Sequence, residues 1–321
     1  MTTLKRREFL ASMAGVSALG LSGSLAFLPS NALAAVREKG YYSYKVGPGI
    51  EVISIYDGVW QKPHDESFVV GADVEQTKKA LRAANLEDEN IPIEFAFTVV
   101  KTGGKTILID AGTGGQGAPT AGLAHVGLAA AGITPADIDA ILISHLHPDH
   151  IFGLMEKETN AQVYPNAEIL VGETEYAYWT KDGLIESLPE RRRGLAQRIQ
   201  ATFPKWKNVS QFADGSEVLP GITAVNSFGH TLGHTSFRLS SGGQQVLLLG
   251  DAIIVPALFL SNLDWQLSFD TDRDMASATR KAIVQEAVAD NITIAGYHFG
   301  FPNSGKIEKD GKGYAFHPHS V

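Results

Sequence analysis

Residues 140–153 read AILISHLHPDHIFG, an apolar run that is followed at once by three histidines and an aspartate. The apolar run predicts a buried β-strand. Histidine and aspartate side chains are unusual directly after such a strand. In an extended segment, residues two apart face the same way, so His145 and His147 can bind one metal ion together. Asp149 and His150 then face a second position. Imidazole and carboxylate groups at this spacing indicate a site for zinc or a similar divalent metal.

Polar residues follow other predicted strands farther along the chain. Asp110 opens an Asp-Ala-Gly turn, residues 228–234 read FGHTLGH, Asp251 follows a glycine at a strand end, and His298 follows another apolar strand. Together with the first stretch, these positions resemble the signature of the metallo-β-lactamase superfamily, in the order that the superfamily shows.

The resemblance implies a fold of the α/β (α+β) class, a four-layer αββα sandwich with two divalent metal ions. The first ion is expected at His145, His147, His230 and Asp251. The second is expected at Asp149, His150, His298 and the same Asp251. Asp149 and Asp251 are therefore also the expected catalytic residues. Zinc is the first expectation, with manganese, cobalt or iron as alternatives. Two ions that share a carboxylate can hold a bridging hydroxide as nucleophile and stabilise the oxyanion of a hydrolysis.

Two further polar residues are expected to support the ligands rather than bind metal. Asp110 is expected to orient a ligand histidine, because ligating imidazoles usually donate their other N–H to such a partner. His234 is expected to form hydrogen bonds beside the site, since the first histidine of FGHTLGH is the ligand in the superfamily.

Composition limits the functions that remain. The chain has 321 residues, of which 44% are hydrophobic and 19% charged, as in ordinary globular proteins. It has no cysteine, which excludes disulfides, thiol catalysis and lactamases that bind their second metal through a thiolate. The net charge of −8 argues against nucleic acid as a partner.

The N-terminus predicts export. Residues 4–10 read LKRREFL, a small-residue apolar run follows, and an Ala-Leu-Ala pattern ends at Ala34. These features are typical of a signal peptide over residues 1–34 and resemble a twin-arginine signal. We expect a single hydrolase domain over residues 35–321, periplasmic or secreted, with no stable membrane anchor after cleavage. A homodimer is left open.

Alternating apolar and polar segments predict the secondary structure. Strands are expected at Glu51–Tyr56, Ile93–Val100, Thr106–Asp110, Ala140–Ser144, Glu168–Val171, Ile222–Val225, Gln245–Gly250 and Asn291–Tyr297. Helices are expected at Asp73–Asn85, Thr120–Ala131, Ser187–Thr202 and Asp272–Ala289, the third opening with the spacing of a capping box from Ser187 to Glu190. Gly104-Lys105-Thr106 is interpreted as a hairpin turn and not as a phosphate-binding loop, because the first glycine of that motif is missing.

The substrate is interpreted from a weaker resemblance and from residues near the ligands. The signal, the length and the stretches around Asp251 and His298 are most similar to methyl parathion hydrolase and its lactonase-like relatives. The expected pocket is apolar, lined by Phe152, Trp179, Leu258, Phe259, Trp265, Phe299 and Phe301. Such a pocket suits small, neutral, fairly hydrophobic esters, either lactones or aryl phosphotriesters.

Two alternatives remain. One is a β-lactam or thioester hydrolase of the same fold. The other is a non-catalytic, metal-stabilised binding protein, which the complete set of ligand positions disfavours.

Overall fold

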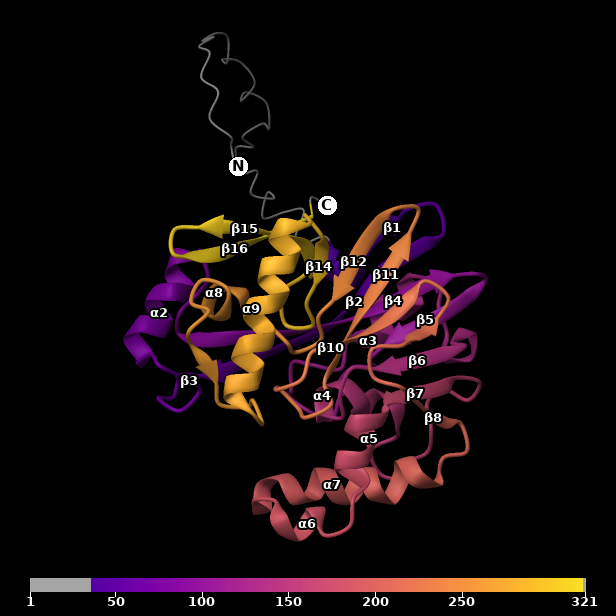
Figure 1. The fold of residues 1–321 in the computed structure, drawn as a ribbon. Helices are drawn as coiled ribbons and strands as arrows, with labels where there is room; N and C mark the ends of the chain where they lie inside the picture. The colour runs from indigo at the N-terminus through magenta and orange to yellow at the C-terminus, as the bar shows by residue number, and fades with distance from the viewer. Residues whose placement is uncertain (1–35, 320–321) are drawn as a thin grey trace, which may run out of the picture.

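The computed structural model of the protein describes residues 36–319, and the predicted signal peptide at residues 1–34 lies outside them. Two sheets of seven strands each pack face to face, and helices cover their outer faces (Figure 1). This is the αββα sandwich that the sequence predicts. Within the described residues, no helix is both long and apolar enough to cross a membrane.

The first sheet has the order β1-β2-β4-β5-β6-β7-β8. Its strands are β1 (Tyr41–Val46), β2 (Ile50–Pro63), β4 (Asn90–Thr102), β5 (Lys105–Ile109), β6 (Ala140–Ile143), β7 (Glu168–Gly172) and β8 (Val209–Phe212). The first four pair antiparallel, whereas β5, β6, β7 and β8 run parallel. The loops after β5 and β6 therefore leave the sheet at the same end of the strands.

The second sheet has the order β16-β15-β14-β12-β11-β10-β9. Its strands are β9 (Glu217–Leu219), β10 (Ile222–Asn226), β11 (Thr235–Ser241), β12 (Gln244–Leu248), β14 (Thr293–Ala295), β15 (Ser304–Asp310) and β16 (Gly313–Pro318). The pair β12 and β14 is parallel, so the loops after them also leave together. A small sheet joins β3 (Val69–Val70) to β13 (Gln266–Leu267).

Strand β6 shows why its sequence is apolar at every position. Ala140 and Leu142 pack into the core cluster that also contains residues of the second sheet, such as Phe237. Ile141 and Ile143 belong to the larger cluster, which includes residues of the outer helices. A strand that is covered on both faces needs a continuous hydrophobic run, because neither face meets water.

The helices lie outside the two sheets. They are α2 (Val74–Ala83), α3 (Ala124–Ala130), α4 (Pro148–Ile151), α5 (Glu173–Thr180), α6 (Leu184–Ser187), α7 (Glu190–Thr202), α8 (Pro256–Phe259) and α9 (Arg273–Ala289). Figure 1 shows α5, α6 and α7 beyond the β7–β8 end of the first sheet and α9 in front of the second.

The eight predicted strands and four predicted helices are all present, with ends shifted by up to seven residues, the largest shift being at the end of β2. The hairpin at Gly103 and Gly104 is confirmed, with φ values of 57° and 78° that suit a two-residue turn between β4 and β5. The prediction of a capping box from Ser187 to Glu190 was wrong. The Ser187 hydroxyl donates to the Leu184 carbonyl at the end of α6, and α7 begins after Pro189.

Candidate metal centre

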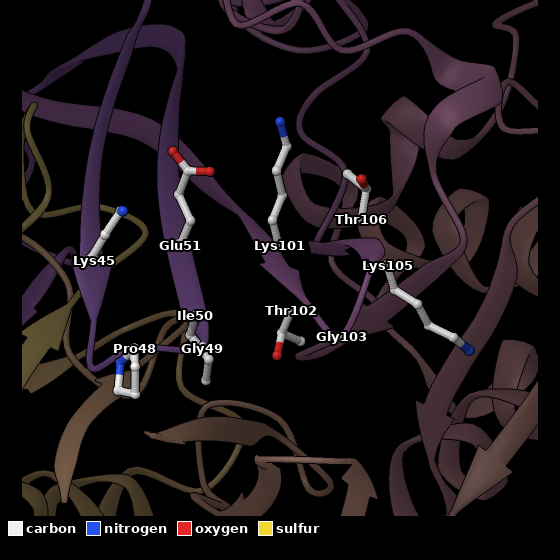
Figure 2. Close-up of a pocket in the computed structure, with 11 residues that line it drawn as sticks. Lys45, Pro48, Gly49, Ile50, Glu51, Lys101, Thr102, Gly103, Lys105 and Thr106 are labelled. Atoms are coloured by element: carbon white, nitrogen blue, oxygen red, sulfur yellow. The ribbon is translucent and has the colours of Figure 1, made fainter. Parts of the chain in front are cut away.

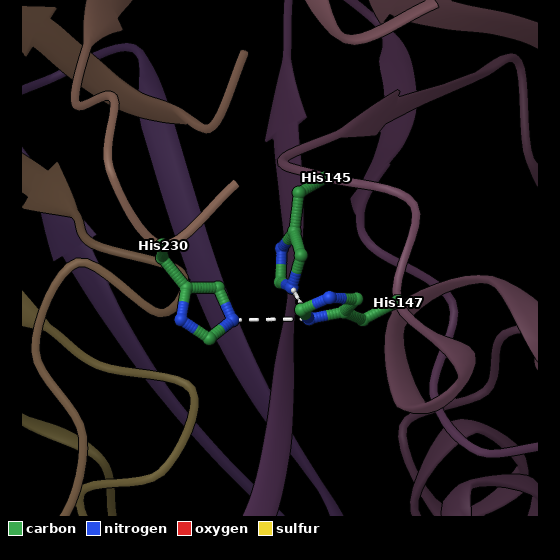
Figure 3. A group of neighbouring side chains, drawn as sticks. All are labelled: His145, His147 and His230. Carbon is green, nitrogen blue, oxygen red and sulfur yellow. Dashed lines mark hydrogen bonds between the residues drawn. The ribbon is translucent and has the colours of Figure 1, made fainter. Parts of the chain in front are cut away.

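Three histidines converge where β6 and β10 end (Figure 3). His145 Nε2 lies 3.0 Å from His147 Nδ1, and His147 Nδ1 lies 3.0 Å from His230 Nε2. These three form the first ligand group, and their nitrogens lie close enough to share one ion. The expected pairing of His145 and His147 from one extended segment is what the structure contains.

The second ligand group combines Asp149, His150, Asp251 and His298. His298 Nε2 lies 3.3 Å from Asp149 Oδ2 and 3.2 Å from Asp251 Oδ2. His150 Nε2 lies 3.2 Å from Asp251 Oδ1. All seven predicted ligands are thus brought together from both sheets.

Asp251 lies between the two groups. Besides its contacts in the second group, its Oδ2 is 3.3 Å from His230 Nε2 and 3.9 Å from His145 Nε2. One carboxylate therefore reaches ligands of both groups, as the expected bridging role requires.

The donor set fits two divalent cations. The ring nitrogens of the first group face one another, and the histidines that carry them are buried or half-buried. In the second group, His150 Nε2 and Asp251 Oδ1 are buried, and neither makes a hydrogen bond within the described residues. Buried ring nitrogens and carboxylate oxygens that converge on one point are the arrangement that a metal cation satisfies.

Hydrogen bonds to the far ring nitrogens hold three ligand histidines in place. Asp110 accepts from His150 Nδ1 at 2.8 Å, and its other oxygen accepts from the Ser144 N–H at 2.8 Å. Asp270 accepts from His230 Nδ1 at 2.9 Å, and the Glu94 carbonyl accepts from His298 Nδ1 at 2.7 Å. Each bond leaves Nε2 free to bind metal. Asp110 thus lies where the sequence placed it, with the left-handed φ of 64° that its turn requires.

His234 lies beside the ligands without belonging to either group. Its Nε2 accepts the Asp251 backbone N–H at 2.9 Å, and its Nδ1 contacts the Ser227 hydroxyl at 2.7 Å. Burial, with the neighbouring His230, lowers the pKa of His234 to about 3. The neutral ring therefore fixes the backbone of the shared carboxylate.

The two groups differ in protonation. Burial lowers the pKa values of His145 and His147 well below 6.5, and neighbouring imidazoles add to this effect. Burial also opposes the charged form of His298 and His150, but Asp251 and the other carboxylates outweigh it. The pKa of His298 rises to about 9, and that of His150 rises well above its usual range.

The predicted pocket residues separate into two kinds. Four are buried core residues: Leu258, Phe259, Phe299 and Phe301. Phe301 packs against Tyr56 with ring centroids 5.3 Å apart, and Phe299 packs against Phe316. These four present almost no surface to a substrate, and assigning them to the pocket was wrong. Position in the sequence next to a ligand did not decide where their rings point.

The other three predicted pocket residues differ from these four: Trp179 is equally buried but lies beside a ligand, and the other two are half-buried. The Trp179 ring is 6.2 Å from His147 in an edge-to-face arrangement. Phe152 is half-buried, with the Arg198 guanidinium 4.4 Å from its ring centre, and Trp265 is also half-buried. These three remain predicted pocket residues.

A surface hollow at the opposite end of the strands is not this site. Figure 2 shows that Lys45, Glu51, Lys101 and the Gly103 turn line it. The hollow lies where β5 begins, whereas Asp110 follows the end of β5.

Several residues that support the ligands were missed by the sequence analysis. Asp270, Glu175 and Tyr297 each contact a ligand or a ligand loop. Asp270 lies 40 positions from the histidine that it contacts, so no local pattern marked it. The Glu94 contact uses a backbone carbonyl, which no residue type reveals.

Comparison with known proteins identifies the class. Residues 96–287, more than half of the chain, match the family described as the metallo-beta-lactamase superfamily. The protein therefore belongs to the metallo-β-lactamase superfamily and is a metal-dependent hydrolase.

Its relatives include lactonases. The N-acyl homoserine lactonase AttM of Azorhizobium caulinodans is 29% identical over 171 residues, which cover 48% of this chain and 60% of the relative. The solved structure of AidC, a dizinc quorum-quenching lactonase in complex with a product, N-hexanoyl-L-homoserine, superposes with a TM-score of 0.81 at 26% identity. That match covers 88% of this chain and 98% of AidC. The hydrolase AbOPH superposes with a TM-score of 0.80 at 25% identity, over 88% of this chain and 98% of its own.

Proposed function

We propose that the protein is a two-metal lactonase that opens neutral lactones carrying an apolar substituent, such as N-acyl homoserine lactones. The observation that carries the proposal is Asp251, whose carboxylate reaches both ligand groups. The likeness of most of the chain to a dizinc lactonase supports both the substrate and the choice of zinc.

The residues that would hold the ions are the two ligand groups described above. Two divalent cations held there would supply a nucleophilic water at neutral pH and polarise the ester carbonyl. The role of the protein itself is to fix the geometry of the ligands and to shield them from water. His145 and His150 are fully buried, which favours strong electrostatic interactions in the site.

Tyr297 supports the second group. Its hydroxyl donates to the Asp149 backbone carbonyl at 2.5 Å, and its ring centre lies 3.9 Å from that of His150. Burial raises the pKa of Tyr297 well above its usual range, so the hydroxyl keeps its proton and remains a donor. Tyr297 therefore holds α4, which carries both residues.

Charge around the site favours neutral substrates. The buried Arg280 pairs with Asp270, and Arg198 donates to Asn160 and Gln116. Both arginines are thus engaged by the protein. A substrate carboxylate would lose its hydration without gaining either of them as a partner. Aryl phosphotriesters are also neutral, which makes them the second candidate substrates.

The test is a substrate panel on zinc-reconstituted protein, with N-hexanoyl homoserine lactone, an aryl phosphotriester and a carboxylate-bearing β-lactam. We expect kcat/KM for the lactone to exceed that for the β-lactam by at least about 100-fold, or roughly 2.7 kcal/mol. Asp264→Ala is the control for substitution in general: Asp264 is exposed and pairs with Lys281 at the surface, so this variant should keep the wild-type ratio. Equal turnover of the β-lactam would overturn the substrate assignment, and faster phosphotriester turnover would favour the second candidate.

A further inference from the structure

Glu175 is a buried carboxylate that neither ligand group contains. It lies in the first turn of α5 and is only 1% exposed. A buried carboxylate is costly unless hydrogen bonds replace its hydration, so its partners show what it stabilises.

Both oxygens of Glu175 are fully engaged. Oε1 accepts the Leu146 backbone N–H at 2.9 Å and the Trp179 indole N–H at 2.8 Å. Oε2 accepts the Thr231 hydroxyl at 2.7 Å and the Gly233 backbone N–H at 3.1 Å. One side chain thus takes four donors from three segments of the chain.

Two of these segments carry the ligands of the first group. Leu146 lies between His145 and His147, and Thr231 directly follows His230. The carboxylate therefore joins the loop after β6 in the first sheet to the loop after β10 in the second. In the first group the nitrogens of these loops lie 3.0 Å apart, a spacing that depends on how the two loops are held.

The third segment brings an aromatic ring to the same group. The Trp179 side chain is 3% exposed, and its ring lies 6.2 Å from His147. The bond to Glu175 fixes the orientation of the indole, which covers His147 from the side of α5.

Close packing supports this arrangement. A Cβ atom at Gly233 would lie 2.1 Å from the backbone nitrogen of Glu175. Only glycine allows the FGHTLGH loop to approach α5 closely enough for the Gly233 N–H to reach the carboxylate.

We propose that Glu175 is a positioning residue that sets the geometry of the three-histidine metal site by holding its two loops and Trp179 at fixed separations. The inference rests on the metal-dependent function and deepens it. It does not depend on which ester is the substrate.

The test replaces Glu175 by glutamine, which keeps the shape but turns an amide NH₂ group toward two of the donors. We expect Glu175→Gln to weaken binding of one of the two zinc equivalents by about 10- to 100-fold, as loss of such supporting groups does elsewhere. The other equivalent should keep its affinity. Competition with a chromophoric chelator measures both affinities, and the visible spectrum of the cobalt-substituted protein reports the geometry.

Asp57→Asn is the matched control. Asp57 is equally buried, and its carboxylate accepts from the Thr113 N–H and hydroxyl and from the Ala124 N–H. None of these donors lies in the loop of His145 and His147 or in the loop of His230. Asp57 holds the loop that follows Asp110, so this variant should lower the thermal midpoint and leave unchanged the zinc equivalent that Glu175→Gln weakens.

A milder pair of variants covers the case in which Glu175→Gln does not fold. Thr231→Val removes one of the four hydrogen bonds at nearly constant volume, and Thr231→Ser restores it. We expect the valine variant to change the cobalt spectrum and the serine variant to recover it. Wild-type zinc affinities and cobalt spectra in both Glu175→Gln and Thr231→Val would overturn the proposal. These readouts need no substrate, so failure here is distinct from failure of the lactonase assignment.

Discussion

The two ligand groups lie side by side and share Asp251, yet they are chemically unlike. The first has three imidazoles, of which His145 and His147 are neutral because burial lowers their pKa values. The second has two carboxylates, and its imidazoles have raised pKa values. Without metal, the second group is an ion cluster of protonated histidines and carboxylates. The first group has no such internal compensation.

The difference indicates how each group would take up a cation. A cation entering the first group meets the neutral rings of His145 and His147. A cation entering the second gains stronger attraction from the carboxylates, but it must displace protons. The groups should therefore respond differently to mutation and to pH.

The largest effect is expected from the residue that the groups share. Asp251→Ala should lower zinc content at both groups and reduce kcat/KM by about 1,000-fold or more, roughly 4 kcal/mol. Metal analysis after dialysis, together with steady-state kinetics, measures both. A variant that retains two tightly bound ions would show that Asp251 is not shared.

Paired substitutions of the supporting carboxylates can separate the two groups. Asp270→Asn acts on His230 in the first group, and Asp110→Asn acts on His150 in the second. Each should weaken one zinc equivalent by about 10- to 100-fold. Stepwise chelator titration should show opposite equivalents affected. Loss of the same equivalent in both variants would contradict the division into two groups.

The pH dependence of metal binding sharpens the comparison. In the metal-free protein, the pKa of His298 is about 9, so this ring carries a proton at pH 7 that a metal ion must displace. Zinc affinity of the second group should rise about tenfold per pH unit for each displaced proton between pH 7 and 9, and the contribution of the His298 proton should level off above pH 9. The zinc affinity of the first group should change little over this pH range, because His145 and His147 are already neutral. Calorimetry in buffers of different ionisation enthalpy measures the protons released.

The smallest effect on catalysis is expected at a residue that the sequence misplaced. Phe301 packs against Tyr56, away from the predicted pocket, so Phe301→Ala should change kcat/KM by less than about twofold. It should still destabilise the fold by about 3 kcal/mol through the cavity that it leaves. Chemical denaturation and steady-state kinetics measure the two quantities. A rise in KM for bulky lactones without loss of stability would show that Phe301 does line the substrate pocket.

The sequence predicted the ligands because their signals are local. The run before His145 reveals a strand covered on both faces, and the Asp251 and His298 positions each follow an apolar strand. Their order along the chain resembles that of the superfamily. This resemblance indicated which ligands share an ion, which the spacing alone does not show.

The supporting roles of Asp110 and His234 were predicted because both lie in stretches that resemble the superfamily signature, whereas the contacts of Asp270 and Glu175, which lie outside those stretches, were missed. Asp270 and His230 are 40 positions apart, and Glu175 and Thr231 are 56 apart. Which buried carboxylate meets which loop depends on the packing of α5 and α9 against the sheets. Ring direction depends on packing as well, which is why Phe259 and Phe301 were assigned to the pocket in error.

The ligands come from loops of both sheets, and this gives the metals a mechanical role. Ions bound between the loop after β6 and the loops after β10, β12 and β14 act as cross-links between the two halves of the sandwich. By thermodynamic linkage, a single ion at 100 times its dissociation constant adds about 2.7 kcal/mol of stability. Amide hydrogen exchange should therefore slow at these loops on zinc loading. The hairpin at Gly103, at the opposite end of the first sheet, should exchange at an unchanged rate.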